Sequence, residues 1–304
     1  MCNGTLMDKL ISFAIPLMLS GILQLMFNAV DIIVVGRFSG SQSLAAVGST
    51  TALINVFTNL FIGISLGANV LAARYYALEK SKEMSETVHT AIAFALISGV
   101  GMAVIGLLMA KPALELMGTP DDVIAKSTLY MRIYFCGMPF FMLYNYGAAI
   151  LRAVGDTKRP LLFLIISGVI NALLNLFLVI QFHLDVAGVG IATVISQLIS
   201  CILVLRCLYC SESSYQFRPE KLNIRARYLR QIFEVGIPAG IQSTVINLSN
   251  AMLQSSVNSF GSISMAGYTA ANNILGFLYV SINSVTQACM SFTSQNYGVK
   301  KLKR

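Results

Sequence analysis

Eight apolar runs, each long enough to cross a membrane, dominate this sequence. About 20 apolar residues in a helix span the hydrocarbon core of a bilayer, where only helices or closed barrels satisfy the backbone polar groups. Hydrophobic residues make up 56% of the chain and charged residues 11%, whereas about a quarter of a soluble domain is charged. We therefore expect an all-α polytopic membrane protein with about eight transmembrane helices. The runs cover residues 11–35, 44–73, 88–110, 127–151, 161–182, 186–209, 232–258 and 265–295.

The net charge of +8 comes from cations in the connections between these runs. Alternate connections hold most of the Lys and Arg residues, and the remaining connections hold only Arg37, Lys111, Lys126 and the nearby Arg132. An excess of Lys and Arg marks the cytoplasmic side of a membrane protein. The pattern predicts a cytoplasmic N-terminus, and it argues against nucleic acid as a partner.

One carboxylate, Asp31, lies deep inside the first apolar run. An ionised Asp at the centre of a bilayer costs about 2.5–3.5 kcal/mol on insertion scales, so such a residue usually faces a partner or a transport pathway. On a helix of about 100° per residue, Gln24, Asn28 and Asp31 fall within an arc of about 60°. This polar stripe predicts a helix face directed into a bundle. The alternative is a carboxylate that only hydrogen-bonds for helix packing.

Amide side chains share one helix face in two later runs. Asn171 and Asn175 do so in the fifth run, and Asn247, Asn250 and Gln254 do so in the seventh. A single membrane Asn usually stabilises helix packing, by about 0.6–2 kcal/mol. Several polar faces together are better explained by a wet central cavity, to which the seventh run contributes from the second half of the chain.

An internal repeat organises the chain. Pro16 matches Pro238 and Asn28 matches Asn250, each pair 222 residues apart, and after a gap of one residue the match continues to Tyr76 and Tyr297. Because six runs separate the two copies, they enter the membrane in the same direction, as in parallel repeats. We expect a six-helix bundle over 1–210, a basic cytoplasmic linker over 211–230, and the first two helices of a second bundle over 231–304. A complete second copy needs four more helices, so the chain is expected to be a fragment of a protein with about twelve spans.

Two readings of the linker are open. Its second part carries five cations, which favours an amphipathic stretch lying on anionic lipid headgroups. A plain solvated connection fits the composition equally well.

No chemistry of an enzyme is visible in the sequence. There is no phosphate-binding GxxxxGK[ST] loop, no zinc spacing and no nucleophile with a nearby base, and Cys207 and Cys210 form a lone CxxC motif. We expect a protein that is not an enzyme and binds no cofactor or metal beyond a coupling ion. Energy for any transport must come from an ion gradient or another subunit.

Four motifs together resemble one transporter family, the multidrug and toxic compound extrusion (MATE) transporters, and its bacterial DinF-like and NorM-like branches. The resemblance extends over essentially the whole chain. The motifs are NAVDIIVVGR at 28–37, LRAVGDTKRP at 151–160, GVGIATVIS at 188–196 and QNYG at 295–298.

The resemblance implies two six-helix bundles, with the last four helices of the second bundle absent here. It also implies that a coupling H+ or Na+ binds Asp31 together with Asn171, Asn175 and Thr193. Some branches use an acid in the middle of the seventh span, where this chain has Asn247. The implied activity is antiport across the bacterial plasma (inner) membrane that exports lipophilic, cationic drugs or toxins. No obligate protein partner is implied.

Two other functions are compatible with these observations. A lipid-linked precursor flippase of the wider superfamily shares the helix architecture, but it needs a more cationic cavity than these span interiors provide. The second function is that of a truncated fragment, which does not transport and acts as a membrane anchor or assembly partner.

Overall fold

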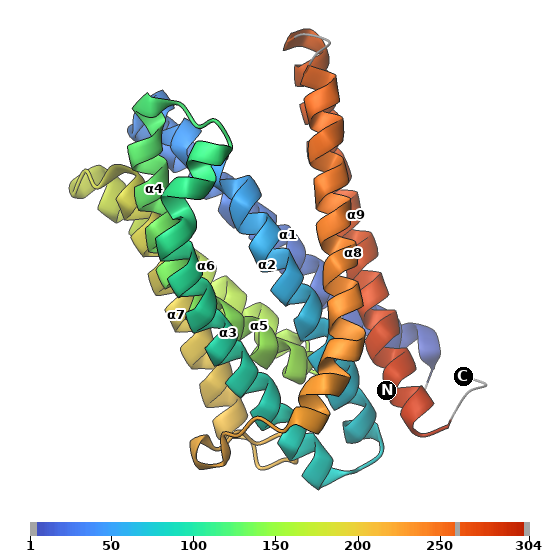
Figure 1. Cartoon of the computed structure of the whole chain (residues 1–304). Coiled ribbons are helices and arrows are strands. Elements are labelled where there is room, and N and C mark those ends of the chain that lie inside the picture. Colours follow the sequence, from blue (N-terminus) through green and yellow to red (C-terminus); the bar gives the residue numbers. More distant parts are fainter. Residues whose placement is uncertain (1–4, 259–261, 301–304) are drawn as a thin grey trace.

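The computed structural model describes residues 5–258 and 262–300, and within them the chain is helical with no β-strand. Figure 1 shows a bundle made by the first seven α-helices, with α8 and α9 running side by side next to it. This confirms the expected all-α membrane fold. The elements are α1 (Leu6–Phe38), α2 (Gly40–Ala77), α3 (Ser81–Leu116), α4 (Asp121–Cys136), α5 (Met138–Ala153), α6 (Lys158–Leu176), the π-helix η1 (Phe177–Gln181), α7 (Asp185–Tyr209), the 3₁₀-helix η2 (Pro219–Lys221), α8 (Ala226–Asn258) and α9 (Ser262–Gly298).

Five helical segments of the described chain are long and apolar enough to cross a membrane, namely α1, α2, α3, α6 with η1, and α7. Large apolar side chains such as Ile97, Leu108 and Leu173 are exposed on them. In a soluble protein such a surface would be an aggregation hazard, but in a bilayer it faces lipid.

The predicted span at 127–151 is not one helix. The chain breaks at Gly137, between α4 and α5, because Pro139 has no N–H to donate and its ring clashes with the carbonyl four residues earlier, that of Phe135. Each helix has 16 residues, about 24 Å in length, which is short of the roughly 30 Å hydrocarbon core. We therefore treat α4 and α5 as the two arms of one bent span.

Several helices begin earlier than the sequence predicted, and α3 and α8 are two of them. α3 begins at Ser81 rather than near residue 88, so its 36 residues make a rod of about 54 Å whose ends extend beyond the hydrocarbon core. α8 begins at Ala226, inside the segment expected to be a linker. The polar residues of these first turns lie outside the apolar windows, and for that reason hydropathy placed both starts too late.

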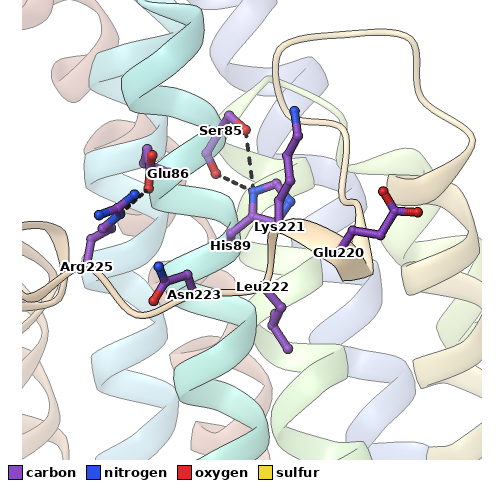
Figure 2. A pocket seen from close by; sticks show the side chains of 8 residues that line it. All are labelled: Ser85, Glu86, His89, Glu220, Lys221, Leu222, Asn223 and Arg225. Atoms are coloured by element: carbon purple, nitrogen blue, oxygen red, sulfur yellow. Dashed lines mark hydrogen bonds and ion pairs between the residues drawn. The ribbon is translucent and has the colours of Figure 1, made fainter.

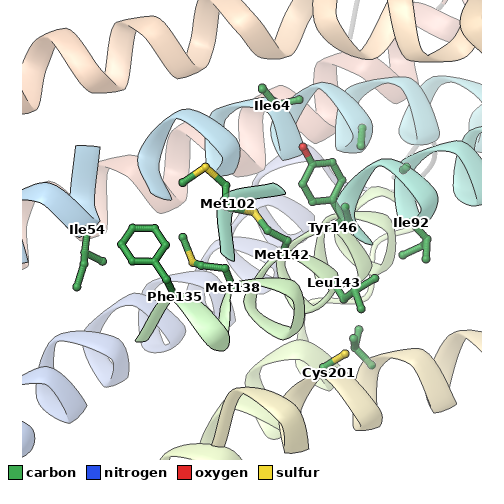
Figure 3. Close-up of a cluster of buried hydrophobic side chains, with 14 of the residues drawn as sticks. Ile54, Ile64, Ile92, Met102, Phe135, Met138, Met142, Leu143, Tyr146 and Cys201 are labelled. Atoms are coloured by element: carbon green, nitrogen blue, oxygen red, sulfur yellow. The ribbon is translucent and has the colours of Figure 1, made fainter. Parts of the chain in front are cut away.

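The core of the bundle lies between α2, α3, α4, α5 and α7. Figure 3 shows flexible thioether side chains filling its centre around Phe135 and Tyr146. Met102, Met138 and Met142 are almost completely buried there. Unbranched Met fills irregular gaps well, which suits a core where the bend between α4 and α5 prevents regular packing.

The two halves of the repeat meet through close helix contacts. On α2 and α8, Gly63, Gly67, Gly236 and Gly240 form two facing GxxxG patterns. A Cβ added at Gly63 would lie 2.2 Å from the Gly240 Cα, and one at Gly67 would lie 2.1 Å from the carbonyl oxygen of Ile232. Only glycine allows two helix backbones to approach so closely.

A second contact joins α1 to α9, and the repeat relates it to the first. Shifting Gly236 back by 222 residues gives Ala14, and shifting Gly67 forward by 221 gives Ala288. Ala14 and Ala288 are buried in one small apolar cluster with Phe13 and Leu17. The two contacts are therefore equivalent, as expected for halves related by an approximate two-fold axis.

Polar side chains near the C-terminal end of α9 tie it to the first half. Ser291 Oγ donates to Asn69 Oδ1 at 2.9 Å, and Asn69 Nδ2 donates to the Ala149 carbonyl oxygen at 2.8 Å. Gln295 Nε2 donates at 2.6 Å to the carbonyl oxygen of Ala153, the last residue of α5. Such terminal carbonyls have no partner within their own helix, so α9 satisfies groups that α5 leaves open.

Candidate functional site

Asp31 lies in the last third of α1, and its half-buried carboxylate faces α6. Asn175 Nδ2 donates a hydrogen bond to Asp31 Oδ1 and lies 3.3 Å from Asn171 Oδ1, one helical turn earlier. Asn171 is 6% exposed and Asn175 is fully buried. The structure therefore brings three of the predicted site residues into one polar chain between α1 and α6.

An oxygen without a partner lies in this chain. Asn175 Oδ1 is buried, and no described residue gives it a hydrogen bond. A buried carbonyl oxygen that lacks a donor is costly, and together with the Asp31 carboxylate it forms an arrangement of oxygen atoms suited to a proton or a small cation. Asn175 Oδ1 is therefore an acceptor without a donor in this site.

Thr193, the fourth residue implied by the family resemblance, is not in this hydrogen-bonded chain. It lies on α7, and its Oγ1 donates to the Val189 carbonyl oxygen of the same helix at 2.9 Å. Its role stays a prediction.

Gln24 and Asn28 lie on α1 before Asp31, and both are exposed. Neither side chain hydrogen-bonds to another residue that the structure describes. These two side chains therefore contribute no hydrogen bond between α1 and a neighbouring helix in the described structure.

The amides of the second half lie on α8, apart from Asp31. Asn250 is exposed, and the exposed Asn247 donates from Nδ2 to the Ser243 carbonyl oxygen of its own helix at 2.8 Å. The side chain of Gln254 lies outside the described residues. No hydrogen bond within the described part connects Asn247 or Asn250 to the first half.

Two tyrosines near the site were missed in the sequence. Tyr130 and Tyr134, one turn apart on α4, lie close enough to Asp31 to interact electrostatically with its carboxylate. Their spacing of four, within an otherwise apolar run, was the available signal. Tyr130 is buried in the core, so only the partly exposed ring of Tyr134 could contact a molecule near Asp31.

Gln197 on α7 was also missed, and the helix break explains its position. Its side chain interacts with Tyr134, and its Oε1 lies 2.4 Å from where a Cβ on Gly137 would be. The missing side chain at the α4–α5 break thus makes room for a polar group from α7. Nothing in the local sequence of either segment predicts that contact.

The π-helix η1 directly follows the polar face of α6. It begins at Phe177, two residues after Asn175. π-helical turns are rare and occur frequently at functional sites, because the wider turn changes which side chains face a neighbour. Here the next position at the same spacing, Val179, is buried and apolar, so the polar face ends at Asn175.

These features define a class, that of multi-pass helical membrane proteins with two related halves and a carboxylate embedded between helices. The chain belongs to the MatE family, whose sequence model matches residues 16–177 and 238–304. The two matched segments begin at Pro16 and Pro238, the same residues that the internal repeat pairs. The match confirms the resemblance found in the motifs.

Curated relatives and solved structures agree with this assignment. The chain is 33% identical over 299 residues to the probable multidrug resistance protein YoeA of Bacillus subtilis, covering 96% of this chain and 65% of that protein. It is 25% identical over 304 residues to YpnP, a probable multidrug resistance protein of the same organism, covering 99% and 67%. A crystal structure titled as MATE in the bent conformation superposes with a TM-score of 0.90 at 22% identity, over 97% of this chain and 66% of that one. The chain thus spans about two thirds of the length of these proteins.

Proposed function

We propose that this chain forms the ion-coupling half of a secondary active transporter that exports small lipophilic molecules in exchange for H+ or Na+. The observation that carries the proposal is the hydrogen-bonded group of Asp31, Asn175 and Asn171 between two membrane helices. A carboxylate in this position is costly unless it is used. Relatives named as probable multidrug resistance proteins support a role in multidrug resistance.

The coupling step follows from the chemistry of the Asp31 carboxylate. An ionised carboxylate accepts a charge-assisted hydrogen bond from Asn175, and such bonds are about twice as strong as neutral ones. A bound proton or Na+ neutralises that charge and weakens the attraction between α1 and α6. The same ligand can use Asn175 Oδ1, which lacks a donor. Ion binding thereby favours a different packing of α1, which is the basis for alternating access.

The substrate class follows from charge and shape. Around Asp31 the described structure offers a carboxylate, amides and the partly exposed aromatic ring of Tyr134. A cation with flat apolar surface gains both electrostatic attraction and ring stacking there. Under this proposal the protein works in the bacterial plasma membrane with its N-terminus in the cytoplasm, and it needs no cofactor and catalyses no covalent chemistry.

A lipid-linked precursor flippase is the less favoured alternative. Its pyrophosphate substrate needs cationic side chains, whereas the group around Asp31 is acidic. A chain that does not transport alone, and serves as an assembly partner, is distinguished from a transporter by the experiment below.

The test is substrate efflux from membrane vesicles with imposed H+ or Na+ gradients. It compares this chain, a version extended to the full length of its relatives, and both with Asp31→Asn. Asp8→Asn is the matched control, because Asp8 is an exposed carboxylate at the start of the same helix.

We expect Asp31→Asn to reduce gradient-driven efflux to the level of empty vesicles while Asp8→Asn transports normally. Efflux at the parental rate from a fully inserted Asp31→Asn protein would overturn the proposal. If only the extended chain transports and its Asp31→Asn variant fails, the coupling role of Asp31 stands and the 304-residue chain does not transport on its own.

A further inference from the structure

The segment between α7 and α8 lies against the first turns of α3, instead of extending into solvent or along a membrane surface. The Arg218 N–H donates to His89 Nε2 at 3.1 Å, and the Arg225 N–H donates to Thr90 Oγ1 at 3.3 Å. Arg225 Nε also pairs with Glu86 Oε2 at 3.1 Å. Both readings of this segment made from the sequence are incomplete, because backbone groups attach it to α3.

His89 is the centre of this attachment. It is 2% exposed, and the ring of the buried Phe217 stacks on the imidazole with centroids 5.7 Å apart. Figure 2 shows the imidazole between Ser85 on its own helix and the residues of the linker. A buried histidine with a partner on each nitrogen is fixed in orientation.

The partners also fix its protonation state. His89 Nδ1 lies 2.6 Å from the Ser85 carbonyl oxygen, which can only accept, so Nδ1 carries the proton. Nε2 then presents a lone pair, which accepts the Arg218 N–H. A second proton on the ring would sit on Nε2 and point at that N–H. The hydrogen bond that holds Arg218 is therefore possible only with neutral His89.

Protons can reach the ring from the adjacent cavity. The cavity has a volume of about 310 Å³ and is open to solvent. Its charged lining consists of Glu86 from α3 and Glu220, Lys221 and Arg225 from the linker, and Glu86 is already paired with Arg225. Its other lining residues are Ser85, His89, Leu222 and Asn223.

The attached segment leads directly into α8. α8 begins at Ala226, directly after Arg225, and Ile232 and Gly236 already contact α2 two turns later. A linker held on α3 therefore restrains the start of the second half against the first. A free linker leaves only the helix contacts to hold α8.

We propose that His89 is a pH-sensitive attachment point: in its neutral form it holds the Arg218 segment of the α7–α8 linker on α3, and protonation breaks that hydrogen bond while the contacts of Arg225 with Thr90 and Glu86 remain. Imidazole is the side chain that gains a charge between pH 8 and pH 5. Arg218 loses its partner because the charged ring offers no acceptor, whereas the Phe217 N–H keeps its hydrogen bond to the Leu208 carbonyl oxygen at 3.1 Å.

Hydrogen exchange of the linker amides tests this without any transport assay. Exchange at Arg218 is measured by mass spectrometry between pH 8 and pH 5 and corrected for intrinsic chemistry. We expect protection at pH 8 that falls at least tenfold on acidification. His89→Gln keeps a side-chain acceptor that does not titrate, and it should retain protection at pH 5. His183→Asn is the matched control, since His183 is exposed and is the only other histidine, and it should behave as the parent.

A second measurement covers the case in which His89→Gln does not fold. Nitrogen-15 spectra of histidine-labelled parent protein should show one histidine in the Nδ1–H form at pH 8, with the charged form appearing over the same pH range as the loss of Arg218 protection. Protection that is absent at pH 8, that persists in the parent at pH 5, or that falls equally in His89→Gln would overturn the proposal.

Discussion

α1 and α8 are equivalent helices of the repeat, yet their side chains make different contacts. α8 holds the halves together at its beginning, where Gly236 and Gly240 touch the α2 backbone. α1 carries the candidate ion site near its end, where Asp31 contacts Asn175, and the equivalent α8 residue, Leu253, is exposed. Both copies thus pack through the beginning of the helix, and only α1 places a carboxylate near its end.

The paired contacts differ in how closely they pack. The α2–α8 contact has glycine on both sides, whereas the equivalent α1–α9 contact has Ala14 and Ala288. A methyl group on each side keeps the helices further apart, so the α2–α8 contact has less room for any added atom. The difference predicts that substitutions at Gly67 and at the equivalent Ala288 change the free energy of unfolding by different amounts.

The largest effect is expected at Gly67. Gly67→Ala places a Cβ 2.1 Å from the Ile232 carbonyl oxygen and 2.9 Å from the Gly236 nitrogen. These are backbone atoms, so α8 must move away. We expect the free energy of unfolding to fall by about 3 kcal/mol, the upper end of overpacking effects. Thermal unfolding in detergent measures the loss.

Two controls sharpen this result. Gly48→Ala on the same helix meets no atom within 4 Å and should be neutral or slightly stabilising. Ala288→Gly at the equivalent α9 position should cost only about 1 kcal/mol, mainly through helix propensity. Equal losses at Gly67 and Gly48 would show that α2 and α8 do not pack as described.

Asn175→Ala should have the next largest effect, because it removes the donor that Asp31 accepts from. Hydrogen bonds to charged groups contribute about 1.5–3 kcal/mol, and we expect a loss of about 2 kcal/mol at pH 7. Asn145→Ala is a suitable control, since Asn145 Nδ2 donates at 2.8 Å to the Phe141 carbonyl oxygen in its own helix, and a smaller loss is expected there. The same unfolding assay compares them, and a neutral Asn175→Ala would contradict the contact with Asp31.

The sequence predicted more of the fold than of the site. Apolar length and the repeat offset were sufficient to find most of the spans and to pair Pro16 with Pro238 and Asn28 with Asn250. Spacing also placed Asn171 and Asn175 on one face, but no periodicity within α6 says that this face meets Asp31.

Other features left little or no signal. The break at Gly137 lies in an unbroken apolar run, so hydropathy passes over it. The contacts of Arg218 and Arg225 with α3 use backbone N–H groups, which every residue except proline possesses. The attachment of the linker to α3 therefore left no residue-specific signal in the sequence.

The smallest effect is expected at the repeat-related pair Asn28 and Asn250, and it decides between two roles for membrane amides. An amide that stabilises helix packing contributes about 0.6–2 kcal/mol, but both side chains are exposed in this structure. We therefore expect Asn28→Ala and Asn250→Ala each to change the free energy of unfolding by less than about 0.5 kcal/mol. A loss above 1 kcal/mol at either position would mean that the residue packs against a helix. Stability that is unchanged while the extended chain's efflux falls would place both residues in a shared cavity, where α1 and α8 are again equivalent.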